Sequence, residues 1–210
     1  MSSSYHLVIT GAIASGKSSL IKHILNKFPQ FKPQYEFLDN DPEYGMLLLN
    51  RFINRKISPF NMQSSILDII SNYYVKSDFM IFERSPDDNL QVFTLPMNLK
   101  KYELDYLITK TDEINQTFDI PSFLNGDLIH VYDSNESTYD QATELIKSDL
   151  ENGIQKRIIG LKIDLNTCLT RIKKRGRADE DKYDVKYLKN VIDEYDKIFD
   201  KYGKVSDRQD

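Results

Sequence analysis

The residues best suited to chemistry form one short run near the N-terminal end, Gly-Ala-Ile-Ala-Ser-Gly-Lys-Ser at positions 11–18. The run matches G-x-x-x-x-G-K-[ST], in which glycines let backbone N–H groups close around phosphate oxygens. Lys17 would reach the β- and γ-phosphates of ATP, and the Ser18 hydroxyl would ligate Mg²⁺. The residues expected to bind ATP here are Gly11, Ala12, Ile13, Ala14, Ser15, Gly16, Lys17, Ser18 and Ser19. The run therefore predicts a phosphate-binding loop.

A carboxylate and an arginine stand together in the segment Glu83-Arg84-Ser85. This segment follows the apolar run Phe79–Phe82 and precedes Pro86, which places the pair at the mouth of an expected strand. Open α/β sheets bind their ligands at such strand ends. A surface ion pair is the simpler alternative.

A second carboxylate, Glu36, falls inside another expected strand, Gln34–Leu38. A carboxylate inside a buried strand is costly unless it is paired, and Arg84 is a plausible partner. The alternative is an exposed position on an edge strand.

Five positive charges gather within seven residues further along: Arg171, Lys173, Lys174, Arg175 and Arg177. Such a cluster is most often a solvated helix face. Phosphoryl transfer, however, is catalysed mainly by positioning and charge neutralisation, so a basic flap over the phosphates is expected beside a phosphate loop.

The elements that must position these residues alternate between apolar runs and helical patterns. Expected strands cover Tyr5–Thr10, Gln34–Leu38, Asp78–Phe82, Leu128–Tyr132 and Arg157–Ile163. Helical patterns cover Lys17–Phe28, Pro59–Tyr74, Lys101–Thr117, Thr138–Asn152, Asn166–Lys174 and Val185–Tyr202. This alternation predicts an α/β protein with the P-loop three-layer fold, a five-stranded parallel sheet flanked by helices, in a single domain over residues 1–210. In the expected strand order (second, third, first, fifth, fourth), Leu128–Tyr132 is at the edge and no strand follows Lys201.

Composition narrows the class of partner. The 210 residues carry a net charge of −4, so no overall basic field would hold a nucleic acid. No apolar run approaches the ~20 residues needed to cross a bilayer, and the single cysteine permits no intrachain disulfide. We expect a cytoplasmic protein without a membrane partner. The histidines lack metal-ligand spacing, which argues against a metal enzyme built on them.

Together these motifs resemble the deoxynucleoside kinase family, which includes thymidine, deoxycytidine and insect multisubstrate kinases. The resemblance rests on the phosphate loop, Glu36 nineteen residues after Lys17, Glu83-Arg84-Ser85, and Arg171-x3-Arg175-x-Arg177-x2-Glu180. It implies ATP-dependent phosphorylation of the 5′-hydroxyl of deoxynucleosides, with Mg²⁺. It also implies a homodimer through helices such as Lys101–Thr117.

The resemblance assigns a role to each matching position. Glu36 would be the general base that takes the 5′-hydroxyl proton, and Arg84 would contact Glu36 and the 5′-oxygen. Glu83 would support Mg²⁺ together with Ser18, and Gln63 would pair with the base. The lid, at about residues 171–182, would hold the phosphates and the sugar 3′-hydroxyl. Its ligands would be Arg171, Arg175 and Arg177 for the phosphates and Glu180 for the sugar.

The resemblance also bears on the preferred base. Purine- and cytosine-accepting members pair an arginine seven residues after the base-pairing glutamine with an aspartate five residues after the strand-end arginine. Here those positions are Ile70 and Asn89, so the pair cannot form there, although Asp88 lies one residue away. Ile66 and Ile70 lie on the same helical face as the glutamine. An apolar wall suits the methyl group of thymine, so we expect thymidine to be preferred.

The chain departs from the family pattern near its C-terminal end. Family members have their last strand after the lid, whereas the segment Lys204–Asp210 is polar. Leu128–Tyr132, before the lid, resembles that strand transposed. The site of the adenine base is therefore left open.

Two other functions stay open. A thymidylate (nucleoside monophosphate) kinase shares the fold, the loop and the lid, but it needs a basic handle for the phosphate of its substrate. A non-kinase ATP-binding regulator would need no second pocket.

Overall fold

The computed structural model describes residues 4–176 and 184–205. Their core is a six-stranded parallel sheet in the order β2-β3-β1-β5-β4-β6. The strands are β1 (Tyr5–Gly11), β2 (Lys32–Gln34), β3 (Phe79–Glu83), β4 (Ile129–Asp133), β5 (Lys156–Lys162) and β6 (Gly203–Val205). The helices are α1 (Lys17–Lys27), α2 (Phe37–Asn40), α3 (Pro42–Ile53), α4 (Pro59–Tyr73), α5 (Pro86–Asp88), the π-helix η1 (Asn89–Thr94), α6 (Lys101–Phe118), the 3-10 helix η2 (Phe123–Asn125), α7 (Ser137–Glu151), α8 (Leu165–Arg175) and α9 (Val185–Tyr202). The expected α/β class and three-layer arrangement are confirmed.

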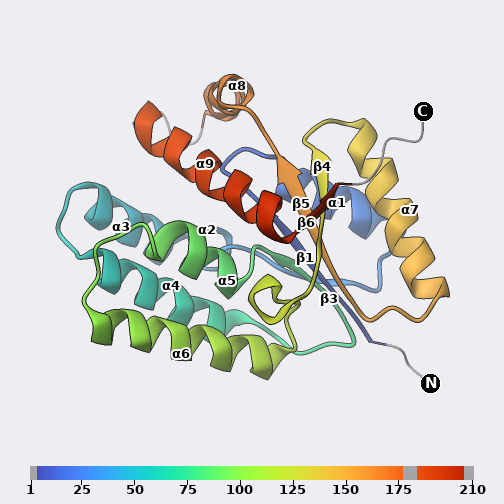
Figure 1. Ribbon diagram of the computed structural model, residues 1–210, viewed down its shortest axis with the longest axis horizontal. Helices are drawn as coiled ribbons and strands as arrows, with labels where there is room; N and C mark the ends of the chain where they lie inside the picture. The colour runs from blue at the N-terminus through green and yellow to red at the C-terminus, as the bar shows by residue number, and fades with distance from the viewer. Residues whose placement is uncertain (1–3, 177–183, 206–210) are drawn as a thin grey trace.

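Helices cover both faces of the sheet (Figure 1). On one face Leu7 and Ile9 of β1 pack with Leu20 of α1 and Ile146 of α7. On the other, Val8 belongs to the core that α4, α6 and α9 cover. Successive side chains of a strand point to opposite faces, so a strand buried on both must be apolar throughout. No helix of the described residues is both long enough and apolar enough to cross a membrane.

The expected helices are all present, with ends shifted by no more than one residue. The second strand was predicted wrongly. It covers Lys32–Gln34, and the expected strand residues Phe37 and Leu38 instead belong to α2, where they pack on the core. The apolar pair that suggested a strand is therefore one face of a short helix.

The C-terminal edge of the sheet also corrects the prediction. Gly203–Val205 follows α9 directly and pairs in parallel with Ile129–Val131 of β4. The sheet therefore has six strands rather than five, and β4 is not at the edge. A three-residue edge strand is stabilised by backbone pairing on one side and needs no continuous apolar run, which is why a polar segment can form it. The order of the other five strands, with β4 beside β5 and α7 as the crossover, is as expected.

Asp87, unassigned by the motifs, is fully buried and ties α5 to the segment that precedes β4. Its carboxylate accepts hydrogen bonds from Asn115 Nδ2 at 2.6 Å, Ser122 Oγ at 2.7 Å and the Leu124 N–H at 3.3 Å. Burial raises the pKa of Asp87 from 3.8 to about 6, although these hydrogen bonds favour the charged form. Asp87 is therefore a structural carboxylate.

Asp87→Asn should remove one component of the pH dependence of stability. Because the folded pKa is the higher one, the contribution of Asp87 is fully present below pH ~4 and is lost as the pH rises through about 6. The loss should be on the order of 3 kcal/mol. The Asn115 oxygen has no partner and could accept from the new amide after a flip, which lets the variant fold.

Urea unfolding of both proteins between pH 4 and 7 checks this expectation. The free energy of unfolding of the unchanged protein should fall relative to that of the variant across this range. Asp105→Asn, at an exposed position of α6, is the matched control and should keep the original pH profile. Parallel curves for Asp87→Asn and the unchanged protein would contradict the assignment.

Candidate active site

The phosphate loop connects β1 to α1, as its motif predicts. Gly11 has φ 145° and Gly16, the N-cap of α1, has φ 92°, both in the range that favours glycine. A Cβ atom at Gly11 would lie 2.6 Å from the Leu161 carbonyl oxygen and 2.8 Å from Ser15 Oγ, so no side chain fits there. The loop thus needs its glycines both for conformation and for space, and it delivers the helix N-terminus to a bound phosphate.

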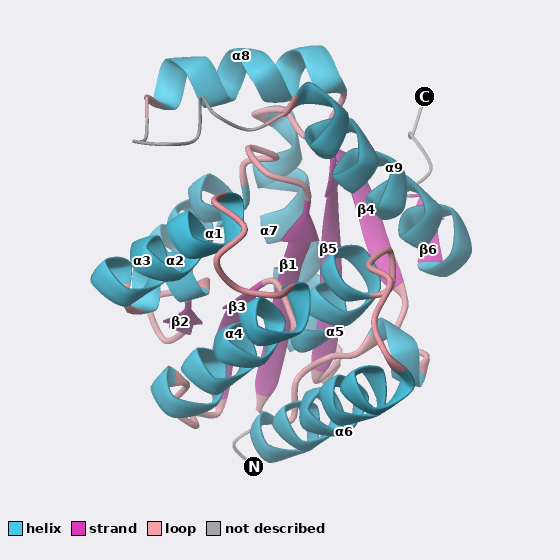
Figure 2. Cartoon of the chain, turned by 90° about the vertical axis from the view of Figure 1, so that its left-hand side faces the viewer, coloured by secondary structure: helices cyan, strands magenta, loops and turns pink. Residues whose placement is uncertain are grey.

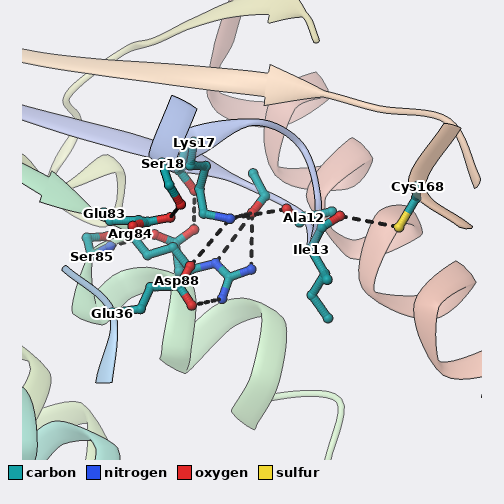
Figure 3. A network of polar contacts seen from close by, with 12 residues as sticks. Ala12, Ile13, Lys17, Ser18, Glu36, Glu83, Arg84, Ser85, Asp88 and Cys168 are labelled. Carbon is teal, nitrogen blue, oxygen red and sulfur yellow. Dashed lines mark hydrogen bonds and ion pairs between the residues drawn. The ribbon is translucent and has the colours of Figure 1, made fainter. Parts of the chain in front are cut away.

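Lys17 lies at the first position of α1 and is almost completely buried. Its Nζ donates to the carbonyl oxygens of Gly11 and Ala12, at 3.2 Å each, and lies 3.4 Å from Glu36 Oε1 (Figure 3). Burial, and then the nearby Arg84, lower the pKa of Lys17 against the opposing effect of Glu36. The ammonium is held inside the loop, next to a carboxylate.

Glu36 sits between two cations. Arg84 NH1 donates to Glu36 Oε2 at 3.0 Å, while Arg84 Nε and NH2 donate to the Gly11 carbonyl oxygen at 3.4 and 3.3 Å. The Arg84 guanidinium also lies over the ring of Phe93, 5.1 Å from its centroid. Burial raises the pKa of Glu36, but Arg84 and Lys17 outweigh it, so that the pKa is lowered and the carboxylate is ionised at neutral pH.

The secondary structure predicted for Glu36 is wrong, although its pairing with Arg84 is as expected. Glu36 lies beyond β2, as the N-cap of α2 with extended backbone, and not within a strand. Its side chain is 18% exposed and that of Arg84 is 13% exposed, so neither the exposed-edge nor the surface-pair alternative holds. Arg84 itself has φ 64°, a left-handed conformation that aims its side chain back over the phosphate loop.

Ser18 and Glu83 form the expected oxygen pair beside the loop. Ser18 Oγ donates to Glu83 Oε1 at 2.7 Å, and Glu83 Oε2 is buried without a hydrogen-bond partner. Burial, and then the nearby Glu36, raise the pKa of Glu83. Within residues 4–176 and 184–205, no three or more His, Cys, Asp or Glu side chains gather as a ready metal site. An unpartnered hard oxygen and a hydroxyl suit Mg²⁺, which takes its remaining ligands from phosphate and water.

Asp88 does not offer the shifted pairing considered from the sequence. Thr10 Oγ1 donates to Asp88 Oδ1, while the Ser85 N–H and Oγ donate to Asp88 Oδ2 at 2.7 and 3.1 Å. Together these bonds cap α5 and fix the turn after β3. Asp88 is fully buried and is not part of the cavity wall.

One cavity of about 660 Å³ collects most of the predicted site residues. Its wall includes Ile13, Ala14, Gly16, Lys17, Ser18, Ser19, Glu36, Gln63, Ile66, Ile70, Glu83, Arg84, Asn89, Arg171 and Arg175. Gly11, Ala12 and Ser15 complete the loop behind this wall. The expected ligands Arg177 and Glu180 lie outside the described residues, as does part of the expected lid.

Several wall residues were missed by the sequence reading. Phe93 and Met97 line the cavity from η1 and the segment after it, and Asn135 and Tyr139 line it beyond β4. Asn135 follows the carboxyl end of a parallel strand, a position that could have been flagged by the strand-end rule. Phe93 belongs to a π-helix, whose period the sequence does not reveal.

Comparisons with known proteins give a family match by sequence and a likeness of fold to solved structures. A sequence model described as "Deoxynucleoside kinase" matches residues 124–207. No curated protein matches the chain by sequence. Three structures of the deoxyadenosine kinase from M. mycoides share the fold: with dCTP (17% identity, TM-score 0.56), with the products dCMP and a flexible dCDP (19%, 0.59), and with dATP (18%, 0.54). Each alignment covers 96% of this chain and 89–90% of the other.

At these identities the structural likeness concerns the fold, whereas the family match concerns the sequence of the C-terminal part. The family match is independent of the phosphate loop, which lies outside the matched segment. The matched segment, the shared fold and the residues gathered in the cavity together support the deoxynucleoside kinase family for this chain.

Proposed function

We propose that this protein transfers the γ-phosphoryl group of ATP to the 5′-hydroxyl of a deoxynucleoside. The observation that carries the proposal is the contact of Lys17, Glu36 and Arg84 inside one cavity. A phosphate loop alone would suit any ATP-binding protein. A buried, ionised carboxylate beside its lysine supplies what an acceptor hydroxyl needs, a general base at the transferred phosphoryl group.

In this proposal each group has one task. Lys17 and the loop N–H groups bind the β- and γ-phosphates, and Arg175 approaches them from the end of α8. Glu36 accepts the proton of the 5′-hydroxyl while Arg84 holds the carboxylate in place. Ser18 and Glu83 would hold Mg²⁺, which neutralises phosphate charge when bound with ATP.

The wall formed by α4 and η1 favours a nucleoside over a nucleotide as the acceptor. Its cavity-lining residues are Met62, Gln63, Ile66, Ile70, Asn89 and Phe93, none of which is a cation. A nucleoside monophosphate would require a basic handle there. Arg84, which lines the same cavity, is already bonded to Glu36.

In a coupled assay, ADP release should therefore be fast with thymidine and slow with thymidylate. The reverse ratio would favour the monophosphate kinase. ADP release that no acceptor changes would favour the ATP-binding regulator.

Within this function we propose that thymidine is the preferred acceptor. Gln63 is 4% exposed, and its Oε1 has no hydrogen-bond partner, so the amide is available to a base. Ile66 and Ile70 line the wall beside it, where a thymine methyl group would be buried. Asp88 is committed to Thr10 and Ser85. Among the described residues, no acidic side chain near Asn89 is therefore available to accept a hydrogen bond from the amino group of a base.

Steady-state kinetics with the four common deoxynucleosides and deoxyuridine test this preference. We expect kcat/KM to be highest for thymidine and lowest for deoxyguanosine. One buried methyl group is worth about 1 kcal/mol, so deoxyuridine should follow within about tenfold. Since the structures of similar fold are named for deoxyadenosine, deoxyadenosine is the competing outcome. A higher kcat/KM for either purine would overturn the preference but not the kinase.

We further propose that the chain acts as a single domain in the cytoplasm, as a homodimer. The exposed residues Tyr102, Tyr106 and Ile108 of α6 support a subunit contact through that helix. We propose that the protein acts without a nucleic-acid or membrane partner.

A further inference from the structure

Arg171 has a bonding pattern that its expected role as a phosphate ligand does not explain. Its NH1 donates to the Ala14 carbonyl oxygen at 3.2 Å and to Ser134 Oγ at 2.5 Å. Its NH2 donates to the Ser134 carbonyl oxygen at 2.8 Å. A guanidinium has five N–H donors. Three of those of Arg171 are thus directed at protein oxygens of the phosphate loop and of the segment after β4.

Ser134 continues this network on the other side of the loop. Its N–H donates to the Lys162 carbonyl oxygen at 2.8 Å, which fixes Ser134 at the ends of β4 and β5. Its Oγ donates to the Ser15 carbonyl oxygen. Arg171 and Ser134 therefore bind the carbonyl oxygens of two successive loop residues, Ala14 and Ser15.

The conformation of the loop makes this network important. Ala14 has φ 60°, which is unfavourable for a residue with a side chain, so its peptide must be held by surrounding contacts. A loop whose carbonyl oxygens are bound on one side can direct its N–H groups to the other, where a phosphate binds. Figure 2 shows that α8, which carries Arg171, lies above the carboxyl ends of the central strands.

We propose that Arg171 is a positioning residue that, with Ser134, sets the backbone of the phosphate loop for nucleotide binding. The inference rests on the proposed ATP-binding function but reassigns Arg171 within it. Ser134 directly follows β4, so the network joins three segments: the phosphate loop, the turn after β4, and α8. The same helix ends at Arg175, which lines the cavity.

A double-mutant cycle on nucleotide binding tests the assignment. Arg171→Met, Ser134→Ala and the double variant are titrated with a fluorescent ADP analogue and a non-hydrolysable ATP analogue. We expect each single variant to lower the affinity for both nucleotides by about tenfold, which is the effect of one or two lost hydrogen bonds. The double variant should be no weaker than the worse single variant, because both changes break one network.

Arg171→Lys separates geometry from charge. Lysine has a single nitrogen and cannot place donors where both NH1 and NH2 of Arg171 lie, so a positioning role predicts little recovery of ADP affinity. A phosphate ligand acting by charge would be largely rescued by lysine. Lys147→Met, which removes a positive charge from an exposed position of α7, is the control and should bind as the unchanged protein does. Thymidine affinity should stay within about twofold in all variants, since the network does not touch the α4 wall.

The outcomes are distinct. Multiplicative losses in the cycle, rescue by lysine, or a loss confined to the ATP analogue would overturn the positioning role. Melting temperatures show whether each variant is folded, and the milder Ser134→Ala and Arg171→Lys carry the test if Arg171→Met unfolds. Failure of the unchanged protein to bind ADP would instead contradict the proposed function, and this inference with it.

Discussion

Replacing Glu36 by glutamine should lower kcat by about 10²–10⁴-fold while ATP still binds. The Glu36 carboxylate is ionised, lies 3.4 Å from Lys17, and accepts a hydrogen bond from Arg84 at 3.0 Å. Glutamine keeps the size of the side chain and can still accept a hydrogen bond from Arg84, but it cannot accept a proton. The loss should therefore fall on the chemical step.

Measurement of kcat, together with a separate titration of ATP, checks this expectation. Glu43→Gln is the matched control, because Glu43 is exposed in the first turn of α3 and should leave kcat unchanged. A loss of less than about tenfold for Glu36→Gln would assign Glu36 to a structural role. A loss of ATP binding would instead indicate that the carboxylate mainly positions Lys17.

Arg84→Ala should also lower kcat by about 10²-fold or more, and it should change the pH dependence as well. Burial raises the pKa of Glu36, and the charge of Arg84 is the largest single cause that lowers it. Without Arg84 the pKa of Glu36 would rise. Activity requires the ionised carboxylate, so the acid limb of the pH–rate profile should move to higher pH.

The pH–rate profiles of the variant and the unchanged protein should be compared over the range in which both are folded. Arg51→Ala, on the exposed side of α3, is the control for loss of an arginine. Arg84→Lys should recover only part of kcat, because the single nitrogen of lysine cannot replace NH1 on Glu36 together with Nε and NH2 on the Gly11 carbonyl oxygen. An unshifted acid limb in Arg84→Ala would show that another group limits the rate at low pH.

The parts of this protein that could be predicted from its sequence are those specified by local patterns. The phosphate loop is a contiguous motif between an apolar strand and an amphipathic helix, and its context can be read directly. Helices such as Val185–Tyr202 were predicted with their observed ends because helical spacing is a local property. The Glu83-Arg84 pair was placed correctly at a strand end because the buried run before it is unbroken.

The edges of the sheet were predicted poorly for a physical reason. β2 and β6 are three residues long, and exposed positions in each let polar side chains such as Lys32 and Lys204 occur there. Their position depends on backbone pairing with β3 and β4, and backbone groups are the same whatever the side chains, so the amino-acid sequence does not reveal this pairing. The same limit explains why Glu36 was placed in a strand rather than after one.

Contacts between two side chains of the candidate site could be predicted from the sequence, whereas contacts between a side chain and a backbone carbonyl oxygen could not. The pairing of Glu36 with Arg84 was expected because a buried carboxylate needs a cation. The contacts of Arg171 were not, because its acceptors include the carbonyl oxygens of Ala14 and Ser134, which any residue carries. Sequence reasoning therefore assigned Arg171 to the ligand, whereas the structure joins it to the loop.

The most direct test of the central claim follows the transferred group itself. The protein is incubated with Mg²⁺, thymidine and ATP labelled in its γ-phosphoryl group, and the labelled product is identified. We expect labelled thymidine 5′-monophosphate, formed at a rate that Glu36→Gln lowers by about 10²-fold or more. Label that enters none of the four common deoxynucleosides, but is released as free phosphate or transferred to thymidylate, would contradict it.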